Sequence, residues 1–381
     1  MRRRIHRNLL AVVIAATVAP GHASAQSDTS SWSSGTITAP QQRGGDVKIM
    51  KRSPGSTGPA GGSSRPVSAT TAPATAPSAA APRLPYAVPQ PDPASVAASD
   101  PAQLAYEAFD QGRYVTAREL GEKAATAGVP EAHTLLGRLY HDGLGIGRDE
   151  VAAAQWYRKG AELGDPEAMF LFGAMLAEGG AITRDRAGAA QMFEAAARRG
   201  HVAAHYNLAL LFLKGDGKPE NPVRAAAHMR FAAERGLAEA QYDLATLYMT
   251  STGVDADAIS AAGWLEKAAE QGMPDAEVEF AISLFLGRGI AVDQERGARL
   301  FRSAAEKGNA VAQNRLARCY ARGTGVPADP VEATKWHTLA RAKGLEDKEL
   351  DAVAARLSRA DRTRAAEAAQ AWIDQRTLGA N

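Results

Sequence analysis

Apolar, small and polar positions follow one another along most of this chain in a pattern that repeats every 36 residues. Each period begins at a glycine; the first six glycines are followed by an alanine four residues later and a leucine or phenylalanine eight residues later. A period of about 20 to 50 residues is the signature of a repeat protein, whose units pack on their neighbours. The period glycines are Gly128, Gly164, Gly200, Gly236, Gly272, Gly308 and Gly344.

Each period is predicted to form two helices. Apolar positions four, eight, eleven and twelve residues after the glycine fall on one helical face, and several of these helices begin with a proline. An Asp or Asn 21 residues after the glycine is a typical N-cap of a second helix, because its side chain accepts from unpaired backbone N–H groups. The period glycine is then expected to end that helix with a positive φ. The predicted N-caps are Asp149, Asp185, Asn221, Asp257, Asp293 and Asp329.

The first full period shows the motif most completely, as Leu136-Gly137-x2-Tyr140, Gly143-x-Gly145, Asp149, Ala153 and Trp156-Tyr157. This motif resembles the Sel-one-like repeat, a relative of the tetratricopeptide repeat. The resemblance implies an all-α fold, an α-solenoid of antiparallel helix pairs with six repeats over residues 129–344. The family binds proteins and shares no catalytic residues, so the resemblance implies a protein or peptide partner, no enzymatic activity and no cofactor.

Both ends of the repeat array depart from the motif. Residues 101–128 are predicted to form a degenerate tetratricopeptide-like repeat, and residues 345–381 capping helices and a tail. Within the latter, Asp361 is expected to cap a last helix. That helix would place Ala365, Ala369, Trp372 and Ile373 on one face.

The N-terminus is typical of an export signal, with four arginines, an apolar run and the motif Ala23-Ser24-Ala25. Residues 1–25 are therefore predicted to be a signal peptide, cleaved between Ala25 and Gln26, which places the protein in the periplasm or outside the cell. The apolar run is shorter than the about 20 residues of a membrane span, so we expect no stable insertion after cleavage; a retained anchor is the alternative.

Residues 26–100 are rich in Pro, Ala, Ser and Gly and hold 11 of the 20 prolines of the chain. Such a segment buries too little apolar surface to offset its ordering entropy, so a disordered linker is predicted. Within it, the basic and apolar segment Val47–Arg52 is either a docking motif or a chance cluster.

Charge disfavours nucleic acid as a partner. The whole chain has a formal net charge of +2, and loss of the four signal arginines leaves 40 Lys+Arg against 42 Asp+Glu, a net charge of −2. The single cysteine, Cys319, occupies a position that is apolar in other repeats, so we expect a buried thiol.

Candidate catalytic and metal-binding residues give weak signals. His201 and His205 have a spacing that could share a metal ion, yet a solvated helix face explains them better. His228 and His337 stand where other repeats are mostly apolar and are predicted to be partly buried. Some cysteine-rich relatives are linked to penicillin binding, but no serine of residues 101–381 has the Ser-x-x-Lys spacing. A peptidoglycan- or β-lactam-handling enzyme is the disfavoured alternative.

A binding surface is the remaining candidate site. In related repeats the first helices line the concave face, and here the middle repeats are apolar and aromatic where the end repeats carry Arg138, His141 and Arg318. We expect an exported scaffold that binds a protein or peptide in the cell envelope and, by analogy with its relatives, regulates an envelope process. A structural spacer is an alternative function. For the aromatic residues themselves, packing between repeats is the alternative to a groove. The predicted partner groove comprises Phe170, Tyr206, Leu210, Leu213, Tyr242, Met249, Ile282 and Phe285.

Overall fold

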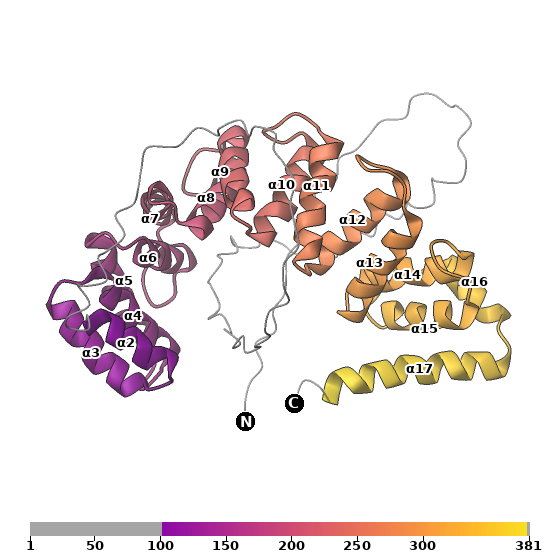
Figure 1. The fold of residues 1–381 in the computed structure, drawn as a ribbon, viewed down its shortest axis with the longest axis horizontal. Coiled ribbons are helices and arrows are strands. Elements are labelled where there is room, and N and C mark those ends of the chain that lie inside the picture. Colours follow the sequence, from indigo (N-terminus) through magenta and orange to yellow (C-terminus); the bar gives the residue numbers. More distant parts are fainter. Residues whose placement is uncertain (1–100, 379–381) are drawn as a thin grey trace, which may run out of the picture. The chain divides into compact units, whose positions relative to one another are not determined.

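The computed structural model describes residues 101–378, all of whose regular elements are helices (Figure 1). The predicted all-α solenoid of helix pairs is confirmed. The predicted signal peptide, its cleavage between Ala25 and Gln26, and the linker of residues 26–100 lie outside the described residues. The described chain divides within one helix into two compact units, residues 101–175 and 176–378, which are considered separately.

The unit of residues 101–175 packs small residues against large ones. Gly137 in α4 lies so close to the Tyr157 ring of α5 that a Cβ there would come within 2.4 Å of it. Leu135, Leu136 and Leu139 are fully buried and join this helix pair to α2 and α3. The helices are α2 (Pro101–Asp110), α3 (Tyr114–Thr126), α4 (Pro130–Asp142), α5 (Glu150–Glu162) and α6 (Pro166–Glu178), which crosses the unit boundary.

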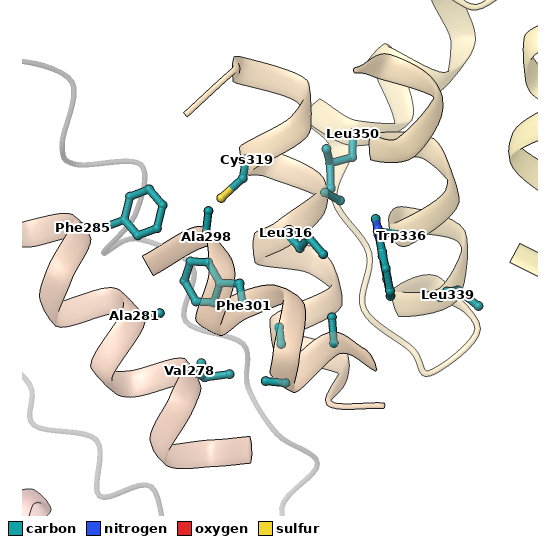
Figure 2. Packing of buried hydrophobic residues seen from close by; sticks show 14 of the residues in the cluster. Val278, Ala281, Phe285, Ala298, Phe301, Leu316, Cys319, Trp336, Leu339 and Leu350 are labelled. Atoms are coloured by element: carbon teal, nitrogen blue, oxygen red, sulfur yellow. The ribbon is translucent and has the colours of Figure 1, made fainter. Parts of the chain in front are cut away.

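The unit of residues 176–378 continues the pattern of helix pairs. Its buried side chains include Phe193, Phe280 and Phe301. Cys319 belongs to a cluster of buried hydrophobic residues that also contains Phe285 and Phe301 (Figure 2). The thiol of Cys319 is buried as predicted, and burial raises its pKa to about 12. The helices after α6 are α7 (Arg186–Arg198), α8 (Val202–Lys214), α9 (Pro222–Glu234), α10 (Ala238–Thr250), α11 (Ala258–Glu270), α12 (Pro274–Leu286), α13 (Gln294–Glu306), α14 (Ala310–Arg322), α15 (Pro330–Arg341), α16 (Lys348–Arg356) and α17 (Arg359–Leu378).

The predicted helix ends are confirmed. Each of the six predicted Asp and Asn N-caps accepts a hydrogen bond from a backbone N–H of the helix that follows, as Asp185 does from Gly188 at 2.8 Å. The seven period glycines all have positive φ, between 79° and 102°. Such side-chain caps stabilise a helix by about 1 kcal/mol each, which fixes where every second helix begins.

In five of the six connectors a glycine stands 17 residues after the period glycine, and it has a further role that the period alone does not indicate. At Gly289 the chain runs against the first residue of α11, and a Cβ would lie 1.9 Å from the carbonyl oxygen of Ala258. Gly253 lies in the same way against Pro222 of α9. These glycines therefore let their connectors contact the preceding second helix.

The C-terminal cap differs from its prediction in two respects. Asp361 does not cap α17; the Asp361 backbone N–H donates to Ser358 Oγ at 3.1 Å, and Ser358 Oγ donates to Asp361 Oδ2 at 2.8 Å. The helix therefore begins at Arg359, three residues earlier than a cap at 361 would allow. Trp372 packs edge-on against Trp336, whereas Ile373 is 38% exposed.

Candidate protein-binding face

Three consecutive first helices, α8, α10 and α12, carry the accessible part of the predicted groove. Leu210, Leu213, Tyr242 and Ile282 are half-buried, and Met249 is 44% exposed. Leu210 and Ile282 occupy the same position of the period, ten residues after its glycine, and therefore face the same way on their helices. We call the accessible side of α8, α10 and α12 the first-helix face.

The other three predicted groove residues are buried and belong to the packing of the repeats. Phe170 is fully buried in its own unit, and Tyr206 is only 8% exposed. Phe285 stacks on Phe301 with ring centroids 5.4 Å apart. For Phe170, Tyr206 and Phe285 the prediction of accessible anchors is wrong, and the alternative of packing between repeats holds, because neighbouring side chains cover the rings.

Tyr206 links two repeats through its hydroxyl, which donates a hydrogen bond of 2.8 Å to Asp243 Oδ2. The Tyr242 hydroxyl lies in the field of Asp243, Asp275 and Glu279. Burial and these carboxylates together raise the pKa of both tyrosines above its usual range. Both phenols therefore remain neutral donors at any physiological pH.

Two of the three helices of the first-helix face, α10 and α12, are acidic, a feature that the pattern of apolar positions did not reveal. Helices α10 and α12 contain no Lys or Arg. Glu277 is paired with Lys307, the C-cap residue of α13, at 2.6 Å. Burial raises the pKa of Glu279, although Arg315 and Arg288 oppose the shift. The carboxylates of the two helices are Glu239, Asp243, Asp275, Glu277 and Glu279.

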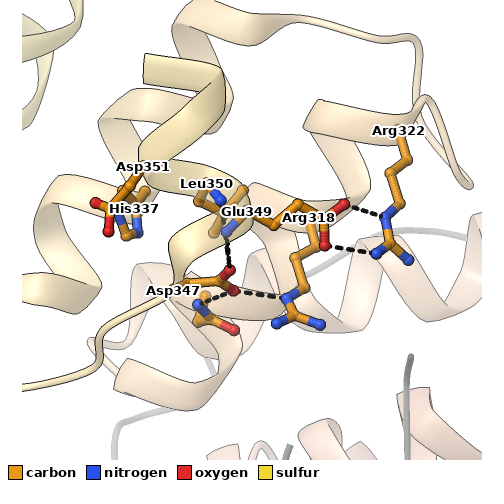
Figure 3. A network of polar contacts seen from close by, with 8 residues as sticks. Arg318, Arg322, His337, Asp347, Glu349, Leu350 and Asp351 are labelled. Atoms are coloured by element: carbon orange, nitrogen blue, oxygen red, sulfur yellow. Dashed lines mark hydrogen bonds and ion pairs between the residues drawn. The ribbon is translucent and has the colours of Figure 1, made fainter. Parts of the chain in front are cut away.

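The next first helix, α14, is basic, and its charges are used within the fold. Arg318 Nε donates to Asp347 Oδ2 at 2.7 Å, and Arg322 forms a two-point contact with Glu349 (Figure 3). Although burial opposes it, hydrogen bonds from Arg318 and Asn314 hold the pKa of Asp347 below its usual value. Asp347 also caps α16. The positions that are open on α12 are thus covered by the C-terminal cap on α14.

The same pairing recurs in the unit of residues 101–175. Thr134 of α4 donates to Asp165, and Arg138 pairs with Glu167. Asp165 in turn accepts from the backbone N–H groups of Glu167 and Ala168, both at 3.2 Å. The polar residues predicted for the end repeats therefore connect one repeat to the next.

The comparison with family models matches the Sel1 repeat over residues 130–165, 166–201, 202–237, 238–273, 275–309 and 310–345, more than half of the chain. The chain belongs to the Sel1 repeat family. Sel1 repeat proteins are generally non-enzymatic scaffolds for protein–protein interactions. A comparison with curated proteins found no match.

Two solved Sel1 structures are similar to this chain. A Sel1 repeat protein from Oxalobacter formigenes shares 27% identity, with a TM-score of 0.57 over 66% of this chain and 100% of its own. The protein c5321 of uropathogenic Escherichia coli, described as a protective antigen with this fold, also shares 27% identity, with a TM-score of 0.51 over 72% of this chain and 68% of its own. Both similarities concern the repeat architecture.

A pair of histidines occupies one junction between Sel1 repeats. The His205 Nδ1 and His228 Nδ1 atoms are 2.9 Å apart, and His205 Nε2 donates to the Ala197 carbonyl at 3.0 Å. His205 is therefore half-buried and not part of a solvated helix face, which corrects its prediction. His228 and His337 are partly or fully buried, as predicted.

Glutamine makes the same junction contact as His205 in other repeats. Gln241 donates to the Ala233 carbonyl at 3.1 Å, and Gln313 donates to the Ala305 carbonyl at 3.2 Å. Each of these side chains stands five residues after a period glycine. At this position of the period, a side-chain N–H group therefore donates a hydrogen bond to a carbonyl of the preceding second helix. In His205 the donor is Nε2.

The described residues were also searched for other kinds of site. Among residues 101–378, no group of three or more His, Cys, Asp or Glu side chains is placed to hold a metal ion. His201 instead caps α8, accepting at Nδ1 from the Ala204 backbone N–H at 3.1 Å. In this same part of the chain, no helix combines the length and the apolar character needed to cross a membrane.

The second helices expose an apolar position of their own, which sequence reasoning missed. Val223 of α9 is 68% exposed and Ile259 of α11 is 74% exposed. Both stand 23 residues after a period glycine, directly beside the contact with the following connector. Isolated exposed apolar side chains are normal on soluble proteins, so Val223 and Ile259 do not by themselves indicate a binding surface.

Proposed function

We propose that this chain is an exported scaffold whose first-helix face binds a protein or peptide partner in the cell envelope, where it regulates an envelope process. The observation that carries the proposal is the set of accessible apolar side chains on consecutive first helices of a Sel1 solenoid, namely Leu210, Leu213, Tyr242, Met249 and Ile282. An apolar centre surrounded by polar groups is typical of protein interfaces.

Export is supported by the sequence of the first 25 residues, and its test is independent of binding. The mature protein is expected to begin at Gln26 and to appear in the periplasmic fraction. N-terminal sequencing of the protein from fractionated cells measures both properties. An intact N-terminus recovered with the inner membrane would contradict cleavage and favour the anchor.

Binding is tested by placing a photo-crosslinking residue at Met249 in cells that make the full chain. The expected result is one discrete adduct, identified by mass spectrometry, because Met249 is an accessible apolar residue of the first-helix face. The matched control is a crosslinker at Ile259, on α11 of the same repeat, which is more exposed but lies outside that face. Equal labelling at both positions, or none at either, would argue for a structural spacer.

A further inference from the structure

A cleft of about 990 Å³ lies between two successive connectors in the unit of residues 176–378. One wall is the connector of residues 287–293 between α12 and α13, and the other is the connector of residues 323–329 between α14 and α15; the first turn of α13 also lines it. We call it the connector cleft. It shares no residue with those named for the first-helix face. Its lining includes Ile290, Val292, Gln294, Glu295, Val326 and Pro327.

Close backbone contacts hold the walls of the connector cleft in place. A Cβ at Gly325 would lie 2.1 Å from the carbonyl oxygen of Gln294, so the second connector rests directly against the first residue of α13. On the first connector, Val292 lies over Gly287, where a Cβ would be 3.1 Å from Val292 Cγ2, and is 59% exposed. Val326 is half-buried on the opposite wall. The cleft therefore presents apolar side chains on both walls.

The charged and apolar positions of this connector are exchanged relative to the first three repeats. Those repeats have a charged residue 20 positions after the period glycine and an apolar residue 23 positions after it, whereas here the two are Val292 and Glu295. No other repeat has a charged residue at the latter position. The residues at position 20 are Arg148, Arg184, Glu220, Ala256, Val292 and Ala328, and those at position 23 are Val151, Ala187, Val223, Ile259, Glu295 and Val331.

The Glu295 carboxylate is exposed and forms no ion pair or hydrogen bond with any of residues 101–378. The adjacent Arg296 is engaged elsewhere, since it pairs with Glu266 of α11 at 2.6 Å and lies 4.9 Å from the centre of the Phe280 ring. Arg299, one turn further along α13, is exposed and forms no ion pair with Glu295. Together with the N-cap Asp293, Glu295 outweighs the half-positive charge of the helix N-terminus, so the cleft is negative.

The first repeat shows how an arginine side chain fits at the corresponding place. There Arg148, at the period position of Val292, pairs with Glu150 on the first turn of α5, and its Nε lies 3.0 Å from Glu150 Oε1. In the connector cleft a first-turn carboxylate is present one position further along the helix, but Val292 replaces the cation. The complementary charge therefore has to come from another segment, whose methylene groups the apolar walls would cover.

We propose that the connector cleft binds an arginine side chain of a second protein, next to apolar residues of the same segment. The guanidinium pairs with Glu295, and its methylene stem lies along Val292 and Val326. The neighbouring apolar residues contact Ile290 and Pro327. Arginine fits this site better than lysine because its planar group offers two parallel N–H donors to one carboxylate. The inference adds a second contact surface and does not depend on the first-helix face.

The test is fluorescence anisotropy with purified full chain and three labelled pentapeptides. The first has a central Arg between two Leu residues, the second has citrulline, which keeps the shape of Arg without its charge, and the third has Ser in place of Leu. The Arg–Leu peptide is expected to bind, more weakly at high salt, and the citrulline peptide about threefold to fivefold less tightly, with little binding of the Arg–Ser peptide. Equal binding of either control peptide would overturn the proposal.

Glu295→Gln tests the pairing itself. It is expected to weaken binding of the Arg–Leu peptide about threefold to fivefold and to leave the citrulline peptide unaffected, because that peptide lacks the charge pair. Equal losses for both peptides would show that Glu295 does not pair with the guanidinium. The control with the same charge change is Glu270→Gln on the exposed end of α11, which should leave binding within about twofold. A loss as large as that of Glu295→Gln would overturn the site.

Val292→Arg tests the place of the guanidinium. Arginine occurs at this position in two other repeats, so the variant is expected to fold with an unchanged thermal midpoint, and its own side chain should block binding of the Arg–Leu peptide. Undiminished binding would overturn the proposal. If the peptide binds the parent only after residues 47–52 are deleted, the occupant is the chain's own basic segment Val47–Arg52, and the assignment to a second protein is overturned.

Discussion

Gly289→Ala is expected to destabilise the protein by about 2–5 kcal/mol, well beyond the effect of Gly236→Ala. Both glycines have positive φ, 70° and 84°, so both substitutions carry the cost of about 1–2 kcal/mol for a left-handed alanine. Only at Gly289 does the new Cβ meet the backbone of α11, 1.9 Å from Ala258 O; nothing lies within 4 Å at Gly236. Relieving this overlap requires the connector to move away from α11, which adds about 1–3 kcal/mol.

Urea denaturation followed by circular dichroism compares the midpoints of the two variants with the parent chain. A Gly289→Ala chain that fails to fold, beside a Gly236→Ala chain that folds, also agrees with the prediction. Equal midpoints would show that glycine is needed at position 289 only because of its positive φ, and that the close approach to Ala258 does not affect stability.

The repeat register could be predicted from the sequence because every level of structure agrees on it. The apolar face, the Asp or Asn N-cap and the glycine at the helix end recur together at fixed positions, so an error of one residue would displace all three. The C-terminal cap lacks this redundancy. There Ser358 and Asp361 were both capable of capping α17, and only the backbone geometry distinguishes them.

The binding face was harder to predict because one position of the period has different exposure in different repeats. Met249 and Phe285 are equivalent, yet Met249 is exposed and Phe285 is buried. The difference comes from the second helix, where Gly297 replaces the alanine of other repeats. A Cβ at Gly297 would lie 2.6 Å from the Phe285 ring, so the missing side chain admits the phenylalanine. The signal was therefore present in the sequence, but as a pair of residues rather than a stripe.

Tyr206 and Tyr242 differ for a similar reason. The Tyr206 hydroxyl finds a carboxylate of suitable length in Asp243, one repeat further on. The equivalent residue facing Tyr242 is Glu279, which is one methylene longer, and Tyr242 remains half-buried. Patterns within a repeat predict its core, whereas the exposure of its surface side chains depends on which residue the neighbouring repeat presents.

The His205–His228 pair is expected to make the protein less stable as the pH falls from about 6.5 to about 4. Burial, and then the neighbouring His228, lower the pKa of His205 to about 4, against 6.5 for an unperturbed histidine. Within this interval the unfolded chain binds a proton that the folded chain does not, so stability is present above it and is lost as the pH falls. Burial also lowers the pKa of His228.

The hydrogen bonds explain why the junction excludes a proton. Because His205 Nε2 donates to the Ala197 carbonyl, the Nδ1 atom of neutral His205 accepts from His228 Nδ1; protonation would place two N–H groups against each other. The surrounding rings add to the cost, since His205 stacks on Phe231 at 3.6 Å. The facing charges are His201 from the preceding turn, Glu194 from α7, Arg224 from α9 and Arg235, the C-cap residue of α9.

His205→Gln is expected to remove this acid sensitivity, because glutamine makes the same junction contact at Gln241 and Gln313. The parent should lose about 1–2 kcal/mol more than the variant between pH 7 and pH 4, less than a fully buried histidine would lose because solvent screens the half-buried ring. The matched control is His201→Asn, which removes a histidine while keeping the cap of α8, since Asn309 caps α14 in the same way. Denaturant midpoints across this pH range measure the difference. Parallel pH profiles for the parent and His205→Gln would show that protonation of His205 does not cost stability, which would contradict the prediction. A flat pH profile for His201→Asn would show that the acid sensitivity comes from His201 instead of His205.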